Sequence, residues 1–329
     1  MIIPLIANSD DFSHAGDISC DKPSSNFFDT IVGQDQARKQ IKFYIDSHSE
    51  DTPVPTLLFT GSQGLGKSYF AERLSKCLNR RLIEVNCAQI TSVSSFINDI
   101  VVNSIMGEEP VTLLFDESHE LIPDISTMLL TALSPCFLKK NIVGFKKTDF
   151  LWDMTRINVV FATTHGFKMF KPLINRCSEV YFYQYSNEEL YKILSTYCGR
   201  QAITLHTSSE QLSDACRGRA RDAFLLSQNI IRYCRSNKIK VLQDHNWHEL
   251  CDIFGIYSRG LKHSEILLMT LIRDVHSISS KNLAVKMGVG VKNVEEELEV
   301  RPRELGLVET SSKGRSLTKE GLDYLASLL

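Results

Sequence analysis

The chain of 329 residues lacks the features that mark secreted, membrane-spanning and disulfide-bonded proteins. No apolar run approaches the roughly 20 residues that a membrane-spanning helix needs. The apolar stretch at residues 1–6 is too short for a secretory signal and has no basic flank. Nine cysteines predict neither a disulfide framework nor a zinc cluster, because their number is odd and none lies closer than about ten residues to the next. We therefore expect reduced, mostly buried thiols, no membrane partner and a cytoplasmic location.

The chain also lacks an excess of charge of either sign. There are 37 Lys and Arg against 39 Asp and Glu, which gives a formal net charge of -2. Such a balance provides no general attraction to nucleic acid, so any DNA contact must come from a local patch. The hydrophobic content of 43% is ordinary for a globular protein, and the length suggests two or three domains.

Hydrophobic periodicity divides the chain into four segments. Residues 1–26 are polar and aperiodic, and we expect a flexible arm. In residues 27–185 short apolar runs alternate with helical stretches, which predicts an α/β domain with a parallel sheet and helices on both faces. Residues 186–259 show only helical periodicity and predict a small all-helical domain. Residues 260–329 predict three helices and a β-hairpin, a pattern typical of a winged-helix module.

The boundaries of single elements also follow from the pattern. An amphipathic helix is expected over residues 35–45. The strands of the parallel sheet are expected at residues 56–60, 81–85, 111–115, 157–163 and 180–182. In the last segment we expect helices at 263–276, 280–287 and 291–305, and hairpin strands at 307–310 and 315–318.

The most specific motif is GSQGLGKS, residues 61–68, directly after an apolar run. Glycines allow positive φ angles, so that successive N–H groups turn inward and bind a phosphate chain. The dipole of the helix that follows adds to the attraction for negative charge. The spacing of the lysine and the serine predicts contacts with the outer phosphates and with Mg²⁺, and therefore ATP and Mg²⁺ as ligands. A glycine-rich turn without a ligand is the alternative. The residues concerned are Gly61, Gly64, Gly66, Lys67 and Ser68.

An acidic pair, Asp116 and Glu117, follows the apolar run 111–115. This places both carboxylates at the C-terminal edge of the predicted sheet, where ligands of such folds bind. We expect Asp116 to hold the Mg²⁺ shell and Glu117 to polarise the attacking water. A solvated strand end is the alternative.

Two further sites are candidates for contact with the nucleotide. The strand predicted at 157–163 ends in Thr164 and His165, where a hydroxyl could sense the terminal phosphate or simply cap the strand. Arg176 precedes the last strand, and its guanidinium is suited to neutralise charge on phosphate, often from a neighbouring subunit.

Three arginines begin a predicted helix in the third segment, and one of them could reach the nucleotide. They are Arg217, Arg219 and Arg221. The alternative, a solvated basic turn, fits at least two of the three.

The order and spacing of these motifs resemble those of the AAA+ ATPases, and most closely those of the RuvB family. The resemblance covers nearly the whole chain, in segments 28–34, 64–67, 116–119, 162–164, 217–221 and 313–315. It implies a ring, hexameric in that family, that hydrolyses ATP at subunit interfaces and moves on double-stranded or branched DNA.

The resemblance also implies roles for single residues. It supports the roles given above to the loop lysine, the loop serine and the acidic pair. Thr164 would be the first sensor, Arg221 the second sensor and Arg176 the arginine finger. Ile31 and Val32 would contact the nucleotide.

Four departures from the family pattern stand out. Ser62 and Gln63 replace two prolines, His165 replaces an arginine, and the finger lies in Asn-Arg-Cys. Residues 142–152 take the place of the hairpin that docks on the junction-binding partner RuvA in that family, but are shorter, carry lysines and have no glycine-rich tip. The departures describe a divergent relative and leave a RuvA-like partner in question.

Three functional hypotheses remain at this stage. The first is an ATP-driven DNA motor, and the second is an ATP-switched loader or initiator that places another protein on DNA. The third makes the winged helix a module for protein interaction, since ten acidic residues offset ten basic ones after Gly260. The resemblance assigns Arg315 to the DNA backbone. The other candidate DNA contacts are Lys292, Arg301, Arg303 and Lys313.

Overall fold

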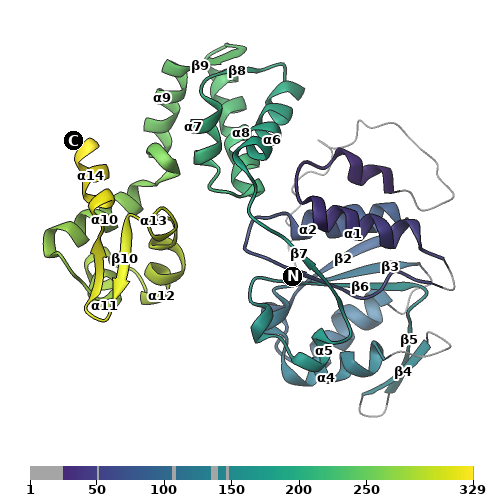
Figure 1. The fold of residues 1–329 in the computed structure, drawn as a ribbon. Helices are drawn as coiled ribbons and strands as arrows, with labels where there is room; N and C mark the ends of the chain where they lie inside the picture. The colour runs from purple at the N-terminus through teal and green to yellow at the C-terminus, as the bar shows by residue number, and fades with distance from the viewer. Residues whose placement is uncertain (1–24, 50–51, 106–108, 135–139, 146–147, 329) are drawn as a thin grey trace. The chain divides into compact units, whose positions relative to one another are not determined.

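The computed structural model describes residues 25–49, 52–105, 109–134, 140–145 and 148–328 (Figure 1). The expected N-terminal arm lies outside them, apart from residues 25 and 26. The chain divides into two compact units. Lys67–Phe182 and the chain up to Gly61 form the first unit, and Tyr183–Leu329 with Ser62–Gly66 form the second.

The first unit is built on a five-stranded sheet in which all strands are parallel. In spatial order the strands are β2 (Arg81–Asn86), β3 (Val111–Asp116), β6 (Ile157–Thr163), β1 (Leu57–Thr60) and β7 (Ser178–Tyr181). The three central strands are buried on both faces, as their continuous apolar runs predict. The five strands expected from the sequence are therefore confirmed, with ends that differ by one or two residues.

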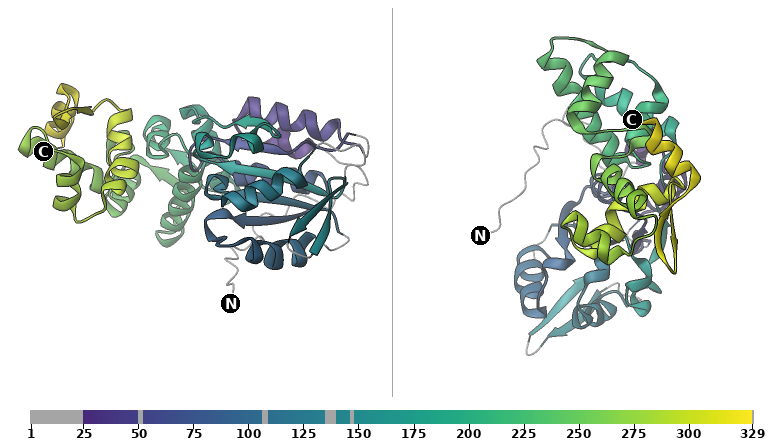
Figure 2. Two further views of the ribbon diagram at one scale, coloured as in Figure 1. Left: turned by 90° about the horizontal axis from the view of Figure 1, so that it is seen from below. Right: turned by 90° about the vertical axis from the view of Figure 1, so that its left-hand side faces the viewer.

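Helices cover both faces of this sheet. Figures 1 and 2 show α1 and α2 on one face and α4 and α5 on the other. The helices of the unit are α1 (Asp35–Asp46), α2 (Lys67–Cys77), α3 (Val93–Phe96), α4 (Pro123–Ala132) and α5 (Lys171–Ile174). Short 3-10 or π-helical segments are η2 (Ser25–Thr30), η3 (Cys87–Gln89), η4 (Ile97–Ile105), η5 (Ser118–Glu120) and η6 (Gly166–Lys168).

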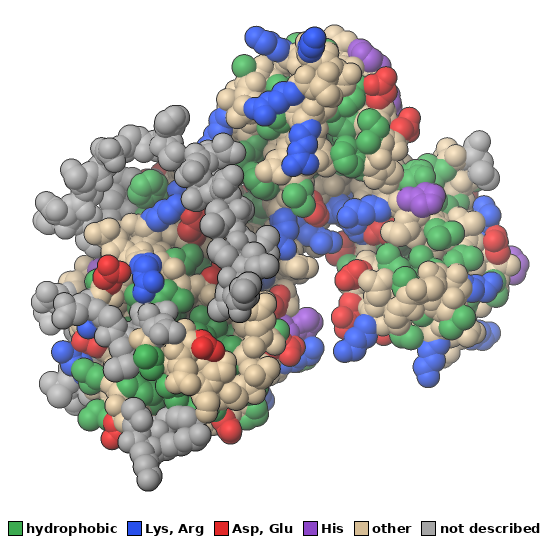
Figure 3. All heavy atoms as spheres, turned by 180° about the vertical axis from the view of Figure 1, so that it is seen from behind, with side chains coloured by type: hydrophobic (Ala, Val, Ile, Leu, Met, Phe, Trp, Pro, Cys, Tyr) green, Lys and Arg blue, Asp and Glu red, His purple; other side chains and the backbone are tan. Residues whose placement is uncertain are grey.

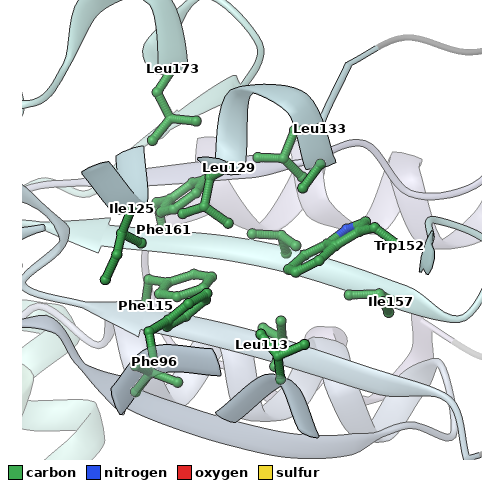
Figure 4. Packing of buried hydrophobic residues seen from close by; sticks show 14 of the residues in the cluster. Phe96, Leu113, Phe115, Ile125, Leu129, Leu133, Trp152, Ile157, Phe161 and Leu173 are labelled. Atoms are coloured by element: carbon green, nitrogen blue, oxygen red, sulfur yellow. The ribbon is translucent and has the colours of Figure 1, made fainter. Parts of the chain in front are cut away.

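Each face of the sheet has its own apolar core. Alternate residues of β3 and β6 point to the α4 side, where Phe115 and Phe161 stack with ring centroids 5.2 Å apart (Figure 4). On the α1–α2 side, the Phe70 ring makes edge contacts with Phe28 and Phe182, with ring centroids 5.6 Å and 5.1 Å apart. Both cores hold the strand ends in a fixed register.

An antiparallel hairpin of β4 (Lys140–Phe145) and β5 (Thr148–Asp153) occupies the expected place. Trp152 and Phe150 are buried in the α4-side core. The cross-strand neighbours Ile142 and Leu151 are 67% and 54% exposed. The lysines expected at the tip, at 146 and 147, lie outside the described residues.

The second unit begins with the segment that was predicted to be helical. Its helices are α6 (Asn187–Arg200), α7 (Ser209–Ala215), α8 (Ala220–Ser236) and α9 (Asp244–Phe254). A capping box of Ser186 and Glu189 begins α6. The segment also contains a parallel pair of three-residue strands, β8 (Thr204–His206) and β9 (Val241–Gln243). Strands of three residues are too short to show an alternating pattern, so the sequence did not predict them.

The three helical regions and the hairpin that were expected follow, and the structure adds a last helix, α14, that was not expected. The elements are α10 (His263–Val275), α11 (Ser280–Met287), α12 (Val291–Asn293), α13 (Val300–Glu304), β10 (Val308–Ser311), β11 (Gly314–Leu317) and α14 (Lys319–Ser327), with η7 (Ser258–Gly260) before them. The single helix expected at 291–305 is divided by a wide π-helical turn, η8 (Val294–Leu298). Pro302, which has no N–H to donate to the preceding turn, lies in α13 after this turn.

Candidate nucleotide-hydrolysis site

The glycine-rich loop connects β1 to α2, as the motif requires. Gly61, Gly64 and Gly66 all have positive φ angles, of 157°, 81° and 98°. A Cβ on Gly61 would lie 2.5 Å from the Phe182 carbonyl oxygen, so only glycine fits there. Lys67 begins α2, is 8% exposed and donates from Nζ to the Gly61 carbonyl oxygen at 2.6 Å.

The centre of the loop belongs to the second unit, where it contacts the start of α8. The Arg221 backbone N–H donates to the Gly64 carbonyl oxygen at 3.1 Å. A Cβ on Gly64 would lie 3.3 Å from Arg221 Cβ and 3.4 Å from Arg219 Cδ. The Tyr185 hydroxyl donates to the Leu65 carbonyl oxygen at 3.2 Å. Two arginines therefore lie against the phosphate-binding loop, and Arg221 is one of them.

The loop residues fit a nucleotide with its metal ion. Lys67 places a buried ammonium directly after the loop, and such a group is suited to bind the terminal phosphates. Ser68 and Asp116 offer the hydroxyl and carboxylate oxygens that Mg²⁺ prefers. Thr60 Oγ1 is buried without a hydrogen-bond partner at the end of β1, directly before the loop.

The acidic pair and the sensor threonine lie on neighbouring strands. β3 ends at Asp116 and pairs with β6, which ends at Thr163. The Glu117 backbone N–H donates to Asp116 Oδ1 at 3.0 Å, and Glu117 has a positive φ of 49°. The Thr164 hydroxyl donates to Glu117 Oε2 at 3.1 Å. The geometry thus brings Glu117 and Thr164 together, although they are 47 residues apart.

Two histidines lie beside this pair. His165 Nδ1 is 2.9 Å from Thr164 Oγ1, and His119 Nδ1 is 3.1 Å from Thr163 Oγ1. Burial lowers the pKa of His119, while the Glu117 and Glu120 carboxylates oppose that shift and His165 and Lys168 add to it. His119 therefore favours the neutral form. The sequence motif contained His119, but nothing in the spacing assigned it a role.

The other nucleotide candidates lie in defined surroundings. The Ile31 carbonyl oxygen accepts from Arg38 Nη1 at 2.8 Å, and Ile31 is buried while Val32 is half-buried. Arg176 is half-buried, and its guanidinium donates to the Leu130 carbonyl oxygen of α4. An arginine finger would use its other N–H groups to bind a phosphate of a neighbouring subunit.

Arg217 differs from the expectation of a solvated charge. It is 7% exposed and forms a buried ion pair with Glu265 of α10, which is 2% exposed. Glu265 Oε2 also accepts the Lys262 backbone N–H at 2.8 Å. The sequence gave no sign of this pairing, because the two residues are 48 positions apart.

The expected DNA contacts are in part engaged within the protein. Arg315 forms ion pairs with Glu299 at 2.8 Å and Glu295 at 3.1 Å, and its side chain is 13% exposed. These carboxylates raise the pKa of Arg315. Arg303 contacts Glu299 at 3.2 Å, and Lys313 is exposed at the hairpin turn. On the face shown in Figure 3, acidic and basic side chains lie next to one another in this part of the chain.

The remaining observations concern metals, thiols and membranes. Among the described residues, no group of three His, Cys, Asp or Glu side chains could hold a metal ion. The seven cysteines within the described ranges are free, and five of them are buried. No described helix combines the length and apolarity needed to cross a bilayer.

Comparison with known proteins agrees with the geometry. Residues 23–181 match the family profile described as the Holliday junction DNA helicase RuvB P-loop domain. The RuvB subunit of the Campylobacter lari branch migration complex is 24% identical over 315 residues, which cover 92% of this chain and 90% of that protein. The corresponding Mycoplasma genitalium subunit is 25% identical over 307 residues, which cover 92% of this chain and 97% of that protein.

The fold agrees with a solved motor structure over most of its length. The Thermotoga maritima RuvB Holliday junction branch migration motor aligns with a TM-score of 0.73 at 18% identity, over 90% of this chain and 95% of that one. A point variant of the same protein aligns with a TM-score of 0.74. Residues 23–181 therefore match the RuvB P-loop domain, and the chain as a whole has the fold of RuvB and resembles RuvB subunits in sequence.

Proposed function

We propose that this protein is an ATP-driven DNA motor of the RuvB type, which moves branched or double-stranded DNA. The observation that carries the proposal is the hydrogen bond from Thr164 to Glu117 at the same sheet edge as the loop lysine. It joins the water-activating acid to the residue that would sense the terminal phosphate. The names of the relatives, which cover most of the chain, support Holliday junctions as the substrate.

Each residue of the site has a place in this reaction. Lys67 would bind the outer phosphates, while Ser68 and Asp116 would hold Mg²⁺. The ion would neutralise charge on the phosphates when bound. Glu117 would accept a proton from the attacking water, and Thr164 would orient that carboxylate.

The proposal includes a ring, hexameric by analogy with the family. Arg176 would reach the nucleotide of the neighbouring subunit, and Arg221 would contact the nucleotide of its own. Ile31 and Val32 would line the nucleotide site. The proposed domain limits are 27–185 for the ATPase domain, 186–259 for the helical domain and 260–329 for the winged helix. A cytoplasmic location belongs to the same proposal.

The DNA contact is proposed for the winged-helix part. Lys313 is exposed at the hairpin turn and carries the simplest contact with a phosphate. Arg315 and Arg303 would contribute only if their ion pairs with glutamates open. A RuvA-like partner would meet the β4–β5 hairpin, whose exposed residues Ile142 and Leu151 form an apolar pair.

The decisive experiment compares ATP hydrolysis without DNA, with linear duplex and with a four-way junction. We expect a rate that rises most with the junction and vanishes in Lys67→Ala, which removes the cation that holds the outer phosphates. A slow rate that no DNA changes would favour the loader hypothesis instead. Undiminished hydrolysis by Lys67→Ala would reject the site.

A further inference from the structure

Two imidazoles surround the hydrogen bond between Thr164 and Glu117. His165 Nδ1 is 2.9 Å from Thr164 Oγ1. His119 Nδ1 is 3.4 Å from Glu117 Oε2, and the two rings lie with centroids 4.8 Å apart. The reaction as described above uses neither ring, although both touch groups that take part in it.

The hydrogen-bond directions follow from what each group can donate. An ionised Glu117 only accepts, so the Thr164 hydroxyl gives its single proton to Oε2. The Thr164 oxygen can then only accept from His165, which assigns the Nδ1–H tautomer to that ring. A directed chain therefore runs from His165 through Thr164 to Glu117.

His119 lies beside the same carboxylate oxygen, with Nδ1 3.4 Å from Glu117 Oε2. Its side chain is 8% exposed, and Nε2 lies 3.3 Å from Glu120 Oε1. The Thr163 hydroxyl accepts the His165 backbone N–H at 3.0 Å, which leaves its own proton for His119 Nδ1 at 3.1 Å. The ring is thus held by Thr163 and Glu120 and lies against Glu117.

We propose that His165 is a positioning residue for ATP hydrolysis, which fixes Glu117 Oε2 through the Thr164 hydroxyl. Glu117 Oε1 is then the oxygen that takes the proton of the attacking water. As that proton moves, the water oxygen bonds to the terminal phosphorus and the bond to the bridging oxygen of ADP breaks. The inference rests on the proposed ATPase activity, and it adds a residue that holds the base in place.

The test compares a variant that keeps the donor with one that removes it. The amide nitrogen of His165→Asn lies where Nδ1 lies and can still donate to Thr164, whereas His165→Phe keeps the ring but cannot donate. We expect His165→Phe to lower kcat about tenfold to a hundredfold, since small displacements of a catalytic group have effects of that size. KM and binding of a fluorescent ATP analogue should stay within about twofold, because ground-state contacts are unchanged.

The control is His206→Leu, because His206 is exposed on β8 and distant in sequence from the site. We expect no change in that variant.

Two results would overturn the inference: a normal kcat in His165→Phe, or an equally low kcat in His165→Asn and His165→Phe. If His165→Phe fails to fold, as judged by circular dichroism and analogue binding, His165→Asn decides. A kcat near that of the wild type supports the inference, and a low kcat contradicts it. Failure of the proposed function is distinct, because the wild-type protein itself would then not hydrolyse ATP more rapidly than Glu117→Gln.

Discussion

The thiol of Cys87 is buried, and the acidic pair acts on it electrostatically. Burial raises the pKa of its thiol to about 12, and the carboxylates of Asp116 and Glu117 contribute to the shift. Burial likewise raises the pKa of Cys77 to about 11. Thiolates are the reactive form, so these cysteines are inert at neutral pH while the protein is folded.

The raised pKa of Cys87 predicts a loss of stability at alkaline pH. Above the ordinary pKa near 9, the unfolded chain releases the thiol proton while the folded chain keeps it, so deprotonation favours unfolding. Between pH 7.5 and 10 we expect Cys87 to contribute roughly 1 kcal/mol to the fall in the free energy of unfolding. Urea unfolding of the wild type and of Cys87→Ala at these two pH values measures the contribution of Cys87. An equal fall in both proteins would contradict the prediction.

Single residues also show where sequence reasoning reaches its limit. The glycines, Lys67 and the acidic pair could be predicted, because local backbone geometry and strand ends fix their positions. The surroundings of His119 could not, since they depend on packing between β3 and β6. The same holds for Arg315, whose partners on η8 and its neighbours were invisible before the fold was known.

At the scale of elements, α10 is joined to the α7–α8 turn by the buried Arg217–Glu265 pair. We expect Arg217→Met to lower the free energy of unfolding by about 3–5 kcal/mol, because it leaves a buried carboxylate without its partner. Arg259→Met is the matched control, since its pair with Glu320 is exposed, and we expect a loss of at most about 1 kcal/mol.

Fluorescence of Trp247, which is buried in the same unit, reports this unfolding in a Trp152→Phe background. The double variant Arg217→Met with Glu265→Leu should recover much of the loss, because no charge is then left buried. Equal effects of Arg217→Met and the control would contradict the prediction.

Lys313 and Arg315 of the β10–β11 hairpin were both predicted from the sequence to contact DNA, but their surroundings in the structure differ. Lys313→Ala should lower the dependence of DNA binding on salt by about one phosphate contact, because Lys313 is exposed at the turn. Arg315→Ala should leave this slope unchanged and lower stability, since it leaves Glu299, 1% exposed, without its main partner. Affinity for duplex DNA measured across a salt series distinguishes the two. If Arg315→Ala lowered the salt dependence and Lys313→Ala left it unchanged, the result would show that the Arg315 ion pairs open on DNA.

Long helices and strands were predicted more accurately than short strands and irregular turns within helices. The parallel strands followed from apolar runs, and the winged-helix pattern followed from periodicity and turn signals. The division of the helix at 291–305 and the pair β8–β9 did not follow. A widened helical turn and three-residue strands leave no distinct trace in hydrophobic periodicity.

At the scale of the whole molecule, the proposed ring predicts that subunits share active sites. Arg176→Ala subunits keep their own Glu117, and Glu117→Gln subunits keep the arginine. In mixtures we expect some ATP hydrolysis to return at interfaces where an intact arginine meets an intact carboxylate. Each variant alone should be almost inactive.

The measurement is ATP turnover across a series of mixing ratios, with Lys67→Ala mixed with Glu117→Gln as the control. Arg176 donates from Nη1 to the Leu130 carbonyl oxygen, which leaves its other N–H groups for a phosphate. No recovery at any ratio would argue for another finger residue.

The bond between Lys67 and the Gly61 carbonyl oxygen has a consequence for the catalytic cycle. An ammonium at 8% exposure needs an acceptor at all times, and the loop backbone supplies one when no phosphate does. A phosphate oxygen that binds Lys67 therefore competes with this carbonyl oxygen for the same ammonium group. The strength of nucleotide binding then depends on the difference between the two contacts.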